Sequence, residues 1–171
     1  MSAYGRTLSF TCALLAALGV STAASAQQLP AAVAAPGYSA VLSAHAEGAQ
    51  LYDCVKAADG KLAWKFREPI ASLLVDGKTV GRHYAGPKWE SVDGSIVVAK
   101  AVGNAPGASA NDIAWLKLEV TAHEGKKGIL SDVAFVQRIN THGGVVSGAC
   151  PQAGAYHSAP YSTEYVFLKK G

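Results

Sequence analysis

The chain reads Trp115-Leu-Lys-Leu-Glu-Val-Thr-Ala-His123, a stretch in which apolar and polar side chains alternate one by one. One face carries Leu116, Leu118, Val120 and Ala122, and the other carries Trp115, Lys117, Glu119, Thr121 and His123. A period of two residues is that of a β-strand, whose successive side chains point to opposite faces of the sheet. The stretch therefore predicts a strand with one face in a core.

The chain on either side of this strand predicts more strands. Downstream, a glycine turn at 125–128 leads into residues 129–140, which alternate again and are expected to form the antiparallel partner, and residues 161–168 repeat the pattern. Upstream, short strand-like runs span 51–56, 62–66, 71–75, 79–84 and 95–102. Three hairpin-turn signals accompany these runs, namely Asp59-Gly60, Asp76-Gly77 and Asp93-Gly94.

The fold class follows from this spacing. No long segment after the N-terminal region shows the 3.6-residue period of an amphipathic helix. Short strands separated by Asp-Gly turns indicate an all-β fold, either an antiparallel sandwich or a partly closed barrel of about eight strands. No glycine-rich loop links a strand to a helix, which argues against dinucleotide and nucleotide-phosphate sites, and we expect no cofactor.

The N-terminus has the parts of a secretory signal peptide. Arg6 precedes an apolar run at 8–20, and Ala24-Ser-Ala26 supplies the small-residue cleavage pattern. The run is shorter than the roughly 20 residues of a membrane-spanning helix, although a retained N-terminal anchor is the alternative. We predict a signal peptide at 1–26, an extended Ala- and Pro-rich leader at 27–43 and a single β domain at 44–171. The product would be periplasmic or extracellular, with no transmembrane segment after cleavage.

Three cysteines are present, and Cys12 lies in the predicted signal peptide. The remaining two, Cys54 and Cys150, are expected to form one disulfide, because an oxidising compartment favours bridges. The bridge would join the first strand to the C-terminal loop. The alternatives are metal ligation, which would need more Cys or His at short spacing, and two separate buried thiols.

The distribution of charge argues against one class of partner. Arg6 is the only one of the 15 basic residues in the predicted signal peptide, which leaves 14 against 12 acidic residues and a net charge of +2. The basic residues are scattered and form no stripe with interleaved aromatics, so we predict no nucleic-acid partner. The sequence leaves the oligomeric state open.

Residues 81–95 form the part of the chain densest in groups that bind or react. They supply five candidates for a ligand site, namely His83, Tyr84, Trp89, Glu90 and Asp93. Flat aromatic faces beside carboxylates are typical of sites that hold sugars or small polar molecules. The alternative is architectural: Trp89 is core, Asp93 belongs to a turn, and the other polar groups brace the loop.

A second cluster, residues 137–144, ends a predicted strand in a glycine turn. Alternation places Arg138 and Asn140 on one face, where they would line a site at the strand end together with His142. In the alternative, Arg138 pairs with a carboxylate such as Glu90 or Glu119. Asn140 would then cap the turn.

The chain also carries distinctive motifs in a fixed order. They are Leu51-Tyr52-x-Cys54, Trp64-x-Phe66 with Glu68-Pro69, Gly81-x-His83-Tyr84-Ala85-Gly86-Pro87-x-Trp89-Glu90-x-x-Asp93-Gly94-Ser95, Trp115-Leu116, Gln137-Arg138-Ile139-Asn140-Thr141-x-Gly143-Gly144, Cys150 and Tyr161-Ser162-x-x-Tyr165-x-Phe167. Together they resemble the secreted proteins of domain-of-unknown-function family 3455, over roughly residues 50–168. That family is functionally uncharacterised, so the resemblance implies little mechanism.

We therefore expect an exported β protein that binds a small molecule or a glycan, or interacts with a surface. The predicted ligand-binding residues are His83, Tyr84, Trp89, Glu90, Asp93, Arg138 and Asn140. The rival hypotheses are a hydrolase that uses Glu90 or Asp93 as its acid or nucleophile, and a purely structural envelope protein. No catalytic residue is assigned, and no metal site is predicted because no His-x-His or His-Glu-x-x-His spacing concentrates ligands.

Overall fold

The computed structural model describes Met1 and residues 28–171. These residues hold eight β-strands and no helix. The strands are β1 (Tyr38–Lys56), β2 (Leu62–Val75), β3 (Lys78–Tyr84), β4 (Lys88–Ser91), β5 (Ser95–Ala105), β6 (Trp115–Gly125), β7 (Phe135–Gly143) and β8 (Tyr156–Lys170). Each strand pairs antiparallel with the next, and β8 returns to pair with β1, so the sheet closes in a ring. The predicted all-β antiparallel fold of about eight strands is confirmed.

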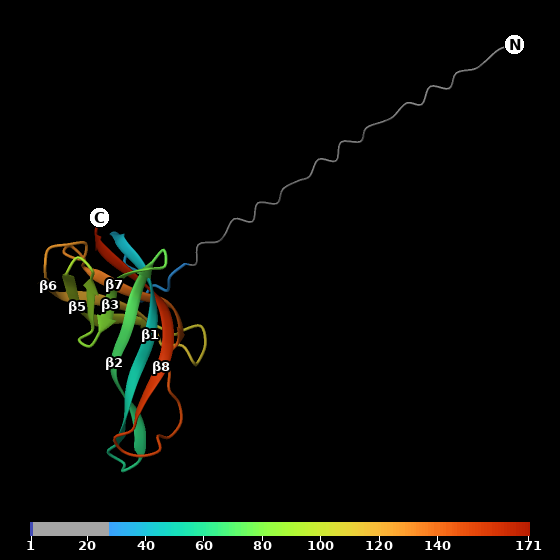
Figure 1. Ribbon diagram of the computed structural model, residues 1–171, viewed down its shortest axis with the longest axis vertical. Coiled ribbons are helices and arrows are strands. Elements are labelled where there is room, and N and C mark those ends of the chain that lie inside the picture. Colours follow the sequence, from blue (N-terminus) through green and yellow to red (C-terminus); the bar gives the residue numbers. More distant parts are fainter. Residues whose placement is uncertain (2–27) are drawn as a thin grey trace.

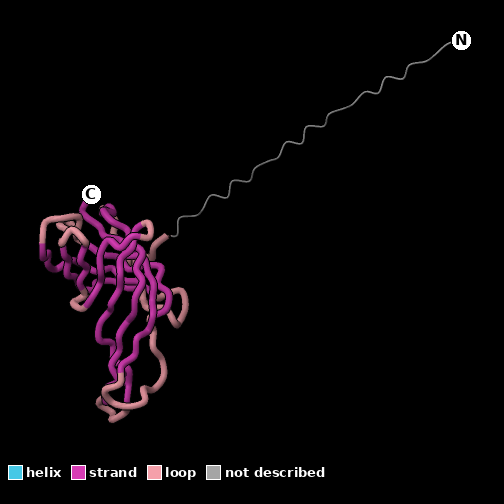
Figure 2. Tube along the Cα trace, viewed as in Figure 1, coloured by secondary structure: helices cyan, strands magenta, loops and turns pink. Residues whose placement is uncertain are grey.

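Three strands extend well beyond the ring. Figure 1 shows β1, β2 and β8 continuing together as a long extension, and Figure 2 shows that this extension ends in loops. The ladder between β1 and β8 runs from the Tyr38–Lys170 pair at one end to the Asp53–Tyr156 pair at the other. In the extension, Cys54 of β1 is bonded to Cys150, which confirms the predicted disulfide.

The Asp-Gly turns lie where the sequence predicts them. Asp76 and Gly77 join β2 to β3 as a two-residue loop, with φ of 49° and 73°. Positive φ at both positions is what a type I′ hairpin turn requires, and it suits the twist of the flanking strands. Gly60 and Gly94 have φ of 82° and 85° in the β1–β2 and β4–β5 connections.

Two strands differ from the prediction because their sequences lack an apolar period. β1 begins at Tyr38, well before the expected start at Leu51, since its first half is rich in Ala and Ser. Ala44 and Ala46 nevertheless face the core, where larger side chains from the other strands fill the space. β4 is only four residues long and lies inside the turn-rich segment 81–95, so no alternation marks it.

The predicted strands at 62–66 and 71–75 form the single strand β2. The predicted strand at 129–140 is wrong at its start, because β7 begins only at Phe135. The residues before it form a turn, in which the Val133 amide donates to the Leu130 carbonyl. Leu130 and Val133 are both buried, so the apolar spacing of this stretch reflects a packed turn instead of a strand.

The described part of the predicted leader packs against the ring. Val33 is fully buried in a cluster with Ala105 and Trp115, and its carbonyl accepts a hydrogen bond of 2.7 Å from Gln137 Nε2. Residues 38–43 belong to β1. The predicted signal peptide lies outside the described residues, apart from Met1. Across residues 28–171, no helix is long and apolar enough to span a membrane.

Candidate functional site

Strand alternation brings two of the predicted site residues to the inside of the ring. His83 of β3 lies directly opposite Trp89 of β4 in the antiparallel ladder. Their rings stack with centroids 4.3 Å apart and planes 10° from parallel. His83 is 3 % exposed and Trp89 is 1 % exposed. The two aromatic rings therefore form one buried plate on the inner wall.

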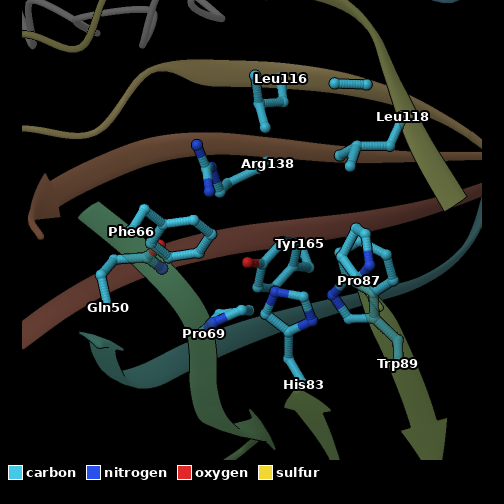
Figure 3. Close-up of a pocket in the computed structure, with 11 residues that line it drawn as sticks. Gln50, Phe66, Pro69, His83, Pro87, Trp89, Leu116, Leu118, Arg138 and Tyr165 are labelled. Atoms are coloured by element: carbon cyan, nitrogen blue, oxygen red, sulfur yellow. The ribbon is translucent and has the colours of Figure 1, made fainter. Parts of the chain in front are cut away.

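Beside this plate the interior is not filled. A cavity of about 250 Å³ remains there. Its lining comes from all eight strands and the β3–β4 loop, and consists of Gln50, Phe66, Pro69, His83, Pro87, Trp89, Ala101, Leu116, Leu118, Arg138 and Tyr165 (Figure 3). Trp89, Leu118 and Tyr165 also belong to the hydrophobic core, so the cavity borders the core directly. Most of the lining is apolar, with a few polar groups.

Arg138 is the cationic group in this lining. Its cross-strand neighbours are Leu116 on β6 and Tyr165 on β8, both of which also line the cavity. Its Nε and Nη2 atoms donate to the Ala114 carbonyl at 3.1 and 2.8 Å. Within residues 28–171, no carboxylate lies within ion-pair distance of Arg138.

The alternative in which Arg138 pairs with Glu90 or Glu119 is therefore wrong. Glu90 pairs with Arg82, and Glu119 lies 3.4 Å from Lys100 Nζ. Both glutamates are on the outside of the ring, whereas Arg138 follows the buried Val136 on the inner face of β7.

His83 is neutral in this site. Its Nδ1 atom lies 2.8 Å from the Lys88 carbonyl, which can only accept a hydrogen bond, so Nδ1 carries the proton and Nε2 a lone pair. Burial lowers the pKa of His83 to about 3; the Lys88 carbonyl acts in the opposite direction, and the Arg138 charge lowers the pKa further. At neutral pH the imidazole therefore offers an acceptor and no charge.

Several polar groups of the lining lack partners within the described protein. Gln50 Nε2 and Trp89 Nε1 are buried and have no hydrogen-bond partner. Tyr165 is fully buried, and burial raises its pKa well above the ordinary value. Its hydroxyl lies 3.3 Å from the hydroxyl of Tyr161, a pair in which either oxygen can donate. Two residues of the lining thus carry buried donors that the described protein does not satisfy.

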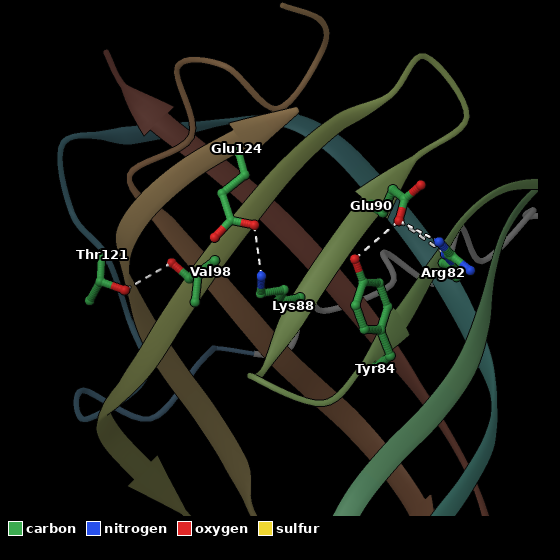
Figure 4. Close-up of polar contacts among 7 residues, drawn as sticks. All are labelled: Arg82, Tyr84, Lys88, Glu90, Val98, Thr121 and Glu124. Carbon is green, nitrogen blue, oxygen red and sulfur yellow. Dashed lines mark hydrogen bonds and ion pairs between the residues drawn. The ribbon is translucent and has the colours of Figure 1, made fainter. Parts of the chain in front are cut away.

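Tyr84 and Glu90 lie on the other side of the sheet from the cavity. Their neighbours in the chain, His83 and Trp89, point into the ring, so Tyr84 and Glu90 point outward. On the outer face, the Glu90 carboxylate accepts hydrogen bonds from Arg82 at 2.8 Å and from the Tyr84 hydroxyl at 3.1 Å (Figure 4). The hydrogen bond from Arg82 lowers the pKa of Glu90, with Tyr84 acting in the same direction. This carboxylate is therefore ionised and already paired at neutral pH.

Asp93 and Asn140 are also separate from the cavity. The Asp93 carboxylate accepts from the Ser95 hydroxyl at 2.6 Å and from the Ile129 amide at 2.8 Å, and thereby ties the β4–β5 turn to the β6–β7 connection. These hydrogen bonds, of which that from the Ser95 hydroxyl has the largest effect, lower the pKa of Asp93 to about 2. Asn140 is exposed, with φ of 51°, at an irregularity in the β7–β8 ladder. The structure thus brings together His83, Trp89 and Arg138 of the predicted set.

The sequence prediction missed part of the lining. Tyr165 alternates with Tyr161, Thr163 and Phe167 on one face of β8, so the pattern that predicts the strand could also have placed it inside. Gln50 follows Ala44, Ala46 and Gly48 at a period of two, but this pattern of small residues gives no apolar signal. Phe66 and Pro69 enter the site through the register irregularity between β1 and β2.

Among the described residues, no group of three or more His, Cys, Asp or Glu side chains gathers in a way that could hold a metal ion. A family model described as "Protein of unknown function (DUF3455)" matches residues 74–169 of the chain. No curated protein and no solved structure gives a significant match.

Proposed function

Because the chain belongs to the DUF3455 family, whose function is unknown, we propose from its own geometry that it is a small-molecule binding protein. The ligand is held inside the ring of strands, against the plate of His83 and Trp89. The observation that carries the proposal is the cavity of about 250 Å³ with its largely apolar lining and convergent polar groups. Ligand sites of proteins typically combine these two features.

The architecture supports this proposal. A closed ring of eight strands has an interior that side chains just fill, or that holds one small ligand where they leave room. Here Ala44, Ala46 and Ala99 are small inward residues in the part of the core that is filled, whereas the space beside Trp89 and Arg138 is empty of protein atoms. Purely structural packing would place apolar groups there instead of a guanidinium and an unpartnered amide.

The cavity favours a small ligand over an extended glycan. At roughly 30 Å³ for each water molecule of the liquid, its volume equals that of about eight waters. One face of the Trp89 indole is covered by His83, and Tyr84 lies outside the ring, so the two aromatic faces do not form a shared sugar platform. The ligand class that fits has on the order of ten non-hydrogen atoms.

A hydrolase that uses Glu90 or Asp93 is not favoured. A general acid of a glycosidase needs a raised pKa, whereas hydrogen bonds lower the pKa of both carboxyl groups. Neither group lines the cavity, and each already has several partners. The binding proposal therefore involves no covalent step.

Export belongs to the same proposal. A signal peptide at 1–26, cleaved after Ala26, would deliver the β domain at 44–171, preceded by its leader, to the periplasm or the exterior. The disulfide between Cys54 and Cys150 supports an oxidising destination. N-terminal sequencing of the protein recovered from a secreting host tests this step, with Gln27 expected as the first residue.

Thermal unfolding tests the binding proposal. The mature protein is heated with a panel of divalent metals, simple sugars, apolar molecules and small organic acids, together with a Leu116→Trp variant that fills the cavity. A Glu119→Trp variant, altered on the exposed face of the same strand, is the control. We expect compounds that raise the melting temperature of the parent and of the control, but not of Leu116→Trp. No shift across the panel, or a shift that persists in Leu116→Trp, would contradict the proposal.

A further inference from the structure

The cavity also indicates what kind of molecule it holds. On the basis of the proposed function, we propose that the ligand is a small organic acid with an apolar body. Its carboxylate lies at the end of the cavity formed by Arg138, Gln50 and the Tyr165 hydroxyl. Its apolar body lies against Trp89, Pro87 and Leu118 at the other end.

The first argument is the charge of Arg138. The guanidinium borders a largely apolar cavity, where a cation is costly unless an anion or several acceptors compensate it. Within the described residues, its Nε and Nη2 atoms donate to one neutral carbonyl, that of Ala114. The Tyr165 hydroxyl, whose pKa burial raises and a hydrogen bond from Arg138 lowers, is its other partner, so both partners are neutral. An anionic ligand would supply the countercharge that the described residues lack.

The second argument is the surplus of donors. Gln50 is 3 % exposed, and its Nε2 atom has two hydrogens and no partner. The Tyr165 hydroxyl lies 3.3 Å from that of Tyr161, and its proton can turn to a ligand that accepts more strongly. A buried donor without a partner is costly, and a carboxylate is a group that only accepts, with about four lone-pair sites. The donor set therefore matches a carboxylate better than an alcohol or an amine.

The third argument is the separation of polar and apolar groups. In Figure 3 the Arg138 guanidinium, the Gln50 amide and the Tyr165 hydroxyl point toward one region of the cavity, near Phe66. Trp89, Pro87 and Leu118 lie together on the opposite side. A free inorganic anion would leave this apolar side empty, whereas a ligand with a carboxylate and a short apolar body would occupy both.

Calorimetric titration tests the inference with two matched probes, 4-phenylbutyrate and 4-phenylbutanol, which differ mainly in the carboxylate. We expect the parent to bind the acid at least tenfold more tightly than the alcohol. In Arg138→Gln this preference should disappear while the alcohol still binds. Arg82→Gln removes an equal charge from the outer surface and should leave the preference unchanged, because Arg82 pairs with Glu90 outside the ring.

The outcomes separate the two proposals. Equal binding of acid and alcohol by the parent would overturn the carboxylate inference and leave the cavity proposal standing. An acid preference that persists in Arg138→Gln would overturn the role of Arg138. Failure of both probes to bind the parent would overturn the carboxylate inference alone, because a compound whose thermal shift is lost in Leu116→Trp would still support the cavity proposal. The comparison within the parent needs no variant, so it remains decisive if Arg138→Gln does not fold.

Discussion

The imidazole of His83 stacks on the indole of Trp89 inside the ring, with centroids 4.3 Å apart. This contact joins two strands that are adjacent in the sequence and places the only buried histidine of the described chain against the core. The Tyr165 ring meets both partners edge to face, at 5.1 Å from His83 and 5.4 Å from Trp89. The three rings therefore pack against one another and form part of the cavity wall.

Acid should destabilise the protein through His83. The pKa of His83 is about 3 in the folded protein and about 6.5 in the unfolded chain, so only the unfolded chain takes up this proton between those values. The free energy of unfolding should therefore fall as the pH falls through this window, by up to about 1.4 kcal/mol per pH unit. Urea unfolding at several pH values measures this slope. It should be shallower in His83→Gln; an equal slope would mean that His83 does not remain neutral.

Removing the disulfide should cost the protein considerable stability. Cys54 and Cys150 close a loop with a sequence separation of 96 residues. In the chain-entropy model, closing a loop of this length stabilises the folded state by about 4 to 5 kcal/mol. Urea unfolding with and without reductant measures the loss. A difference below about 1 kcal/mol would show that the strand extension is held by its ladder alone.

The unpartnered amide of Gln50 predicts opposite changes in stability and binding. Gln50→Leu removes a buried donor that has no partner, so the free protein should become more stable by about 1 kcal/mol. The same change removes a proposed partner of the ligand carboxylate, and the affinity for 4-phenylbutyrate should fall severalfold. Thermal unfolding and calorimetry measure the two quantities. A variant that binds the acid as tightly as the parent would exclude Gln50 from the site.

Changes on the outer face should leave binding intact. Tyr84 and Glu90 interact with each other and with Arg82 outside the ring. We expect Tyr84→Phe and Glu90→Gln to bind 4-phenylbutyrate within twofold of the parent. Calorimetry of each variant checks this. A tenfold loss in either one would place the ligand at Tyr84 and Glu90, on the outer surface.

The sequence predicts the type of fold better than the position of the site, for a physical reason. Alternation in β6 and the Asp-Gly turns are local signals, because side-chain direction and positive φ depend on neighbouring residues only. They were sufficient for an antiparallel all-β chain. They could not show that β1 starts at Tyr38, since small Ala side chains are buried there only by the strands that face them.

The site depends on which face of its strand each residue occupies and on the register in which distant strands pair. His83 and Glu90 are close in the sequence, but they lie on opposite sides of the sheet, because the β3–β4 register pairs His83 with Trp89 and Arg82 with Glu90. Arg138 meets Tyr165 only because β7 pairs with β8 in one register. No local sequence pattern determines this register. The sequence alone could therefore not tell which candidate residues line the cavity and which lie on the outer surface.

The most direct test of the account follows the indole N–H of Trp89 in a two-dimensional ¹H–¹⁵N spectrum. The chain has three tryptophans, so its indole signals can be assigned with Trp64→Phe and Trp115→Phe variants. On titration with 4-phenylbutyrate, we expect the Trp89 signal to move and saturate with the calorimetric affinity. The signal of Trp115, which lies in the separate cluster with Val33, should remain in place. A Trp89 signal that does not move at saturation, or changes confined to Arg82, Tyr84 and Glu90, would contradict a ligand site inside the ring.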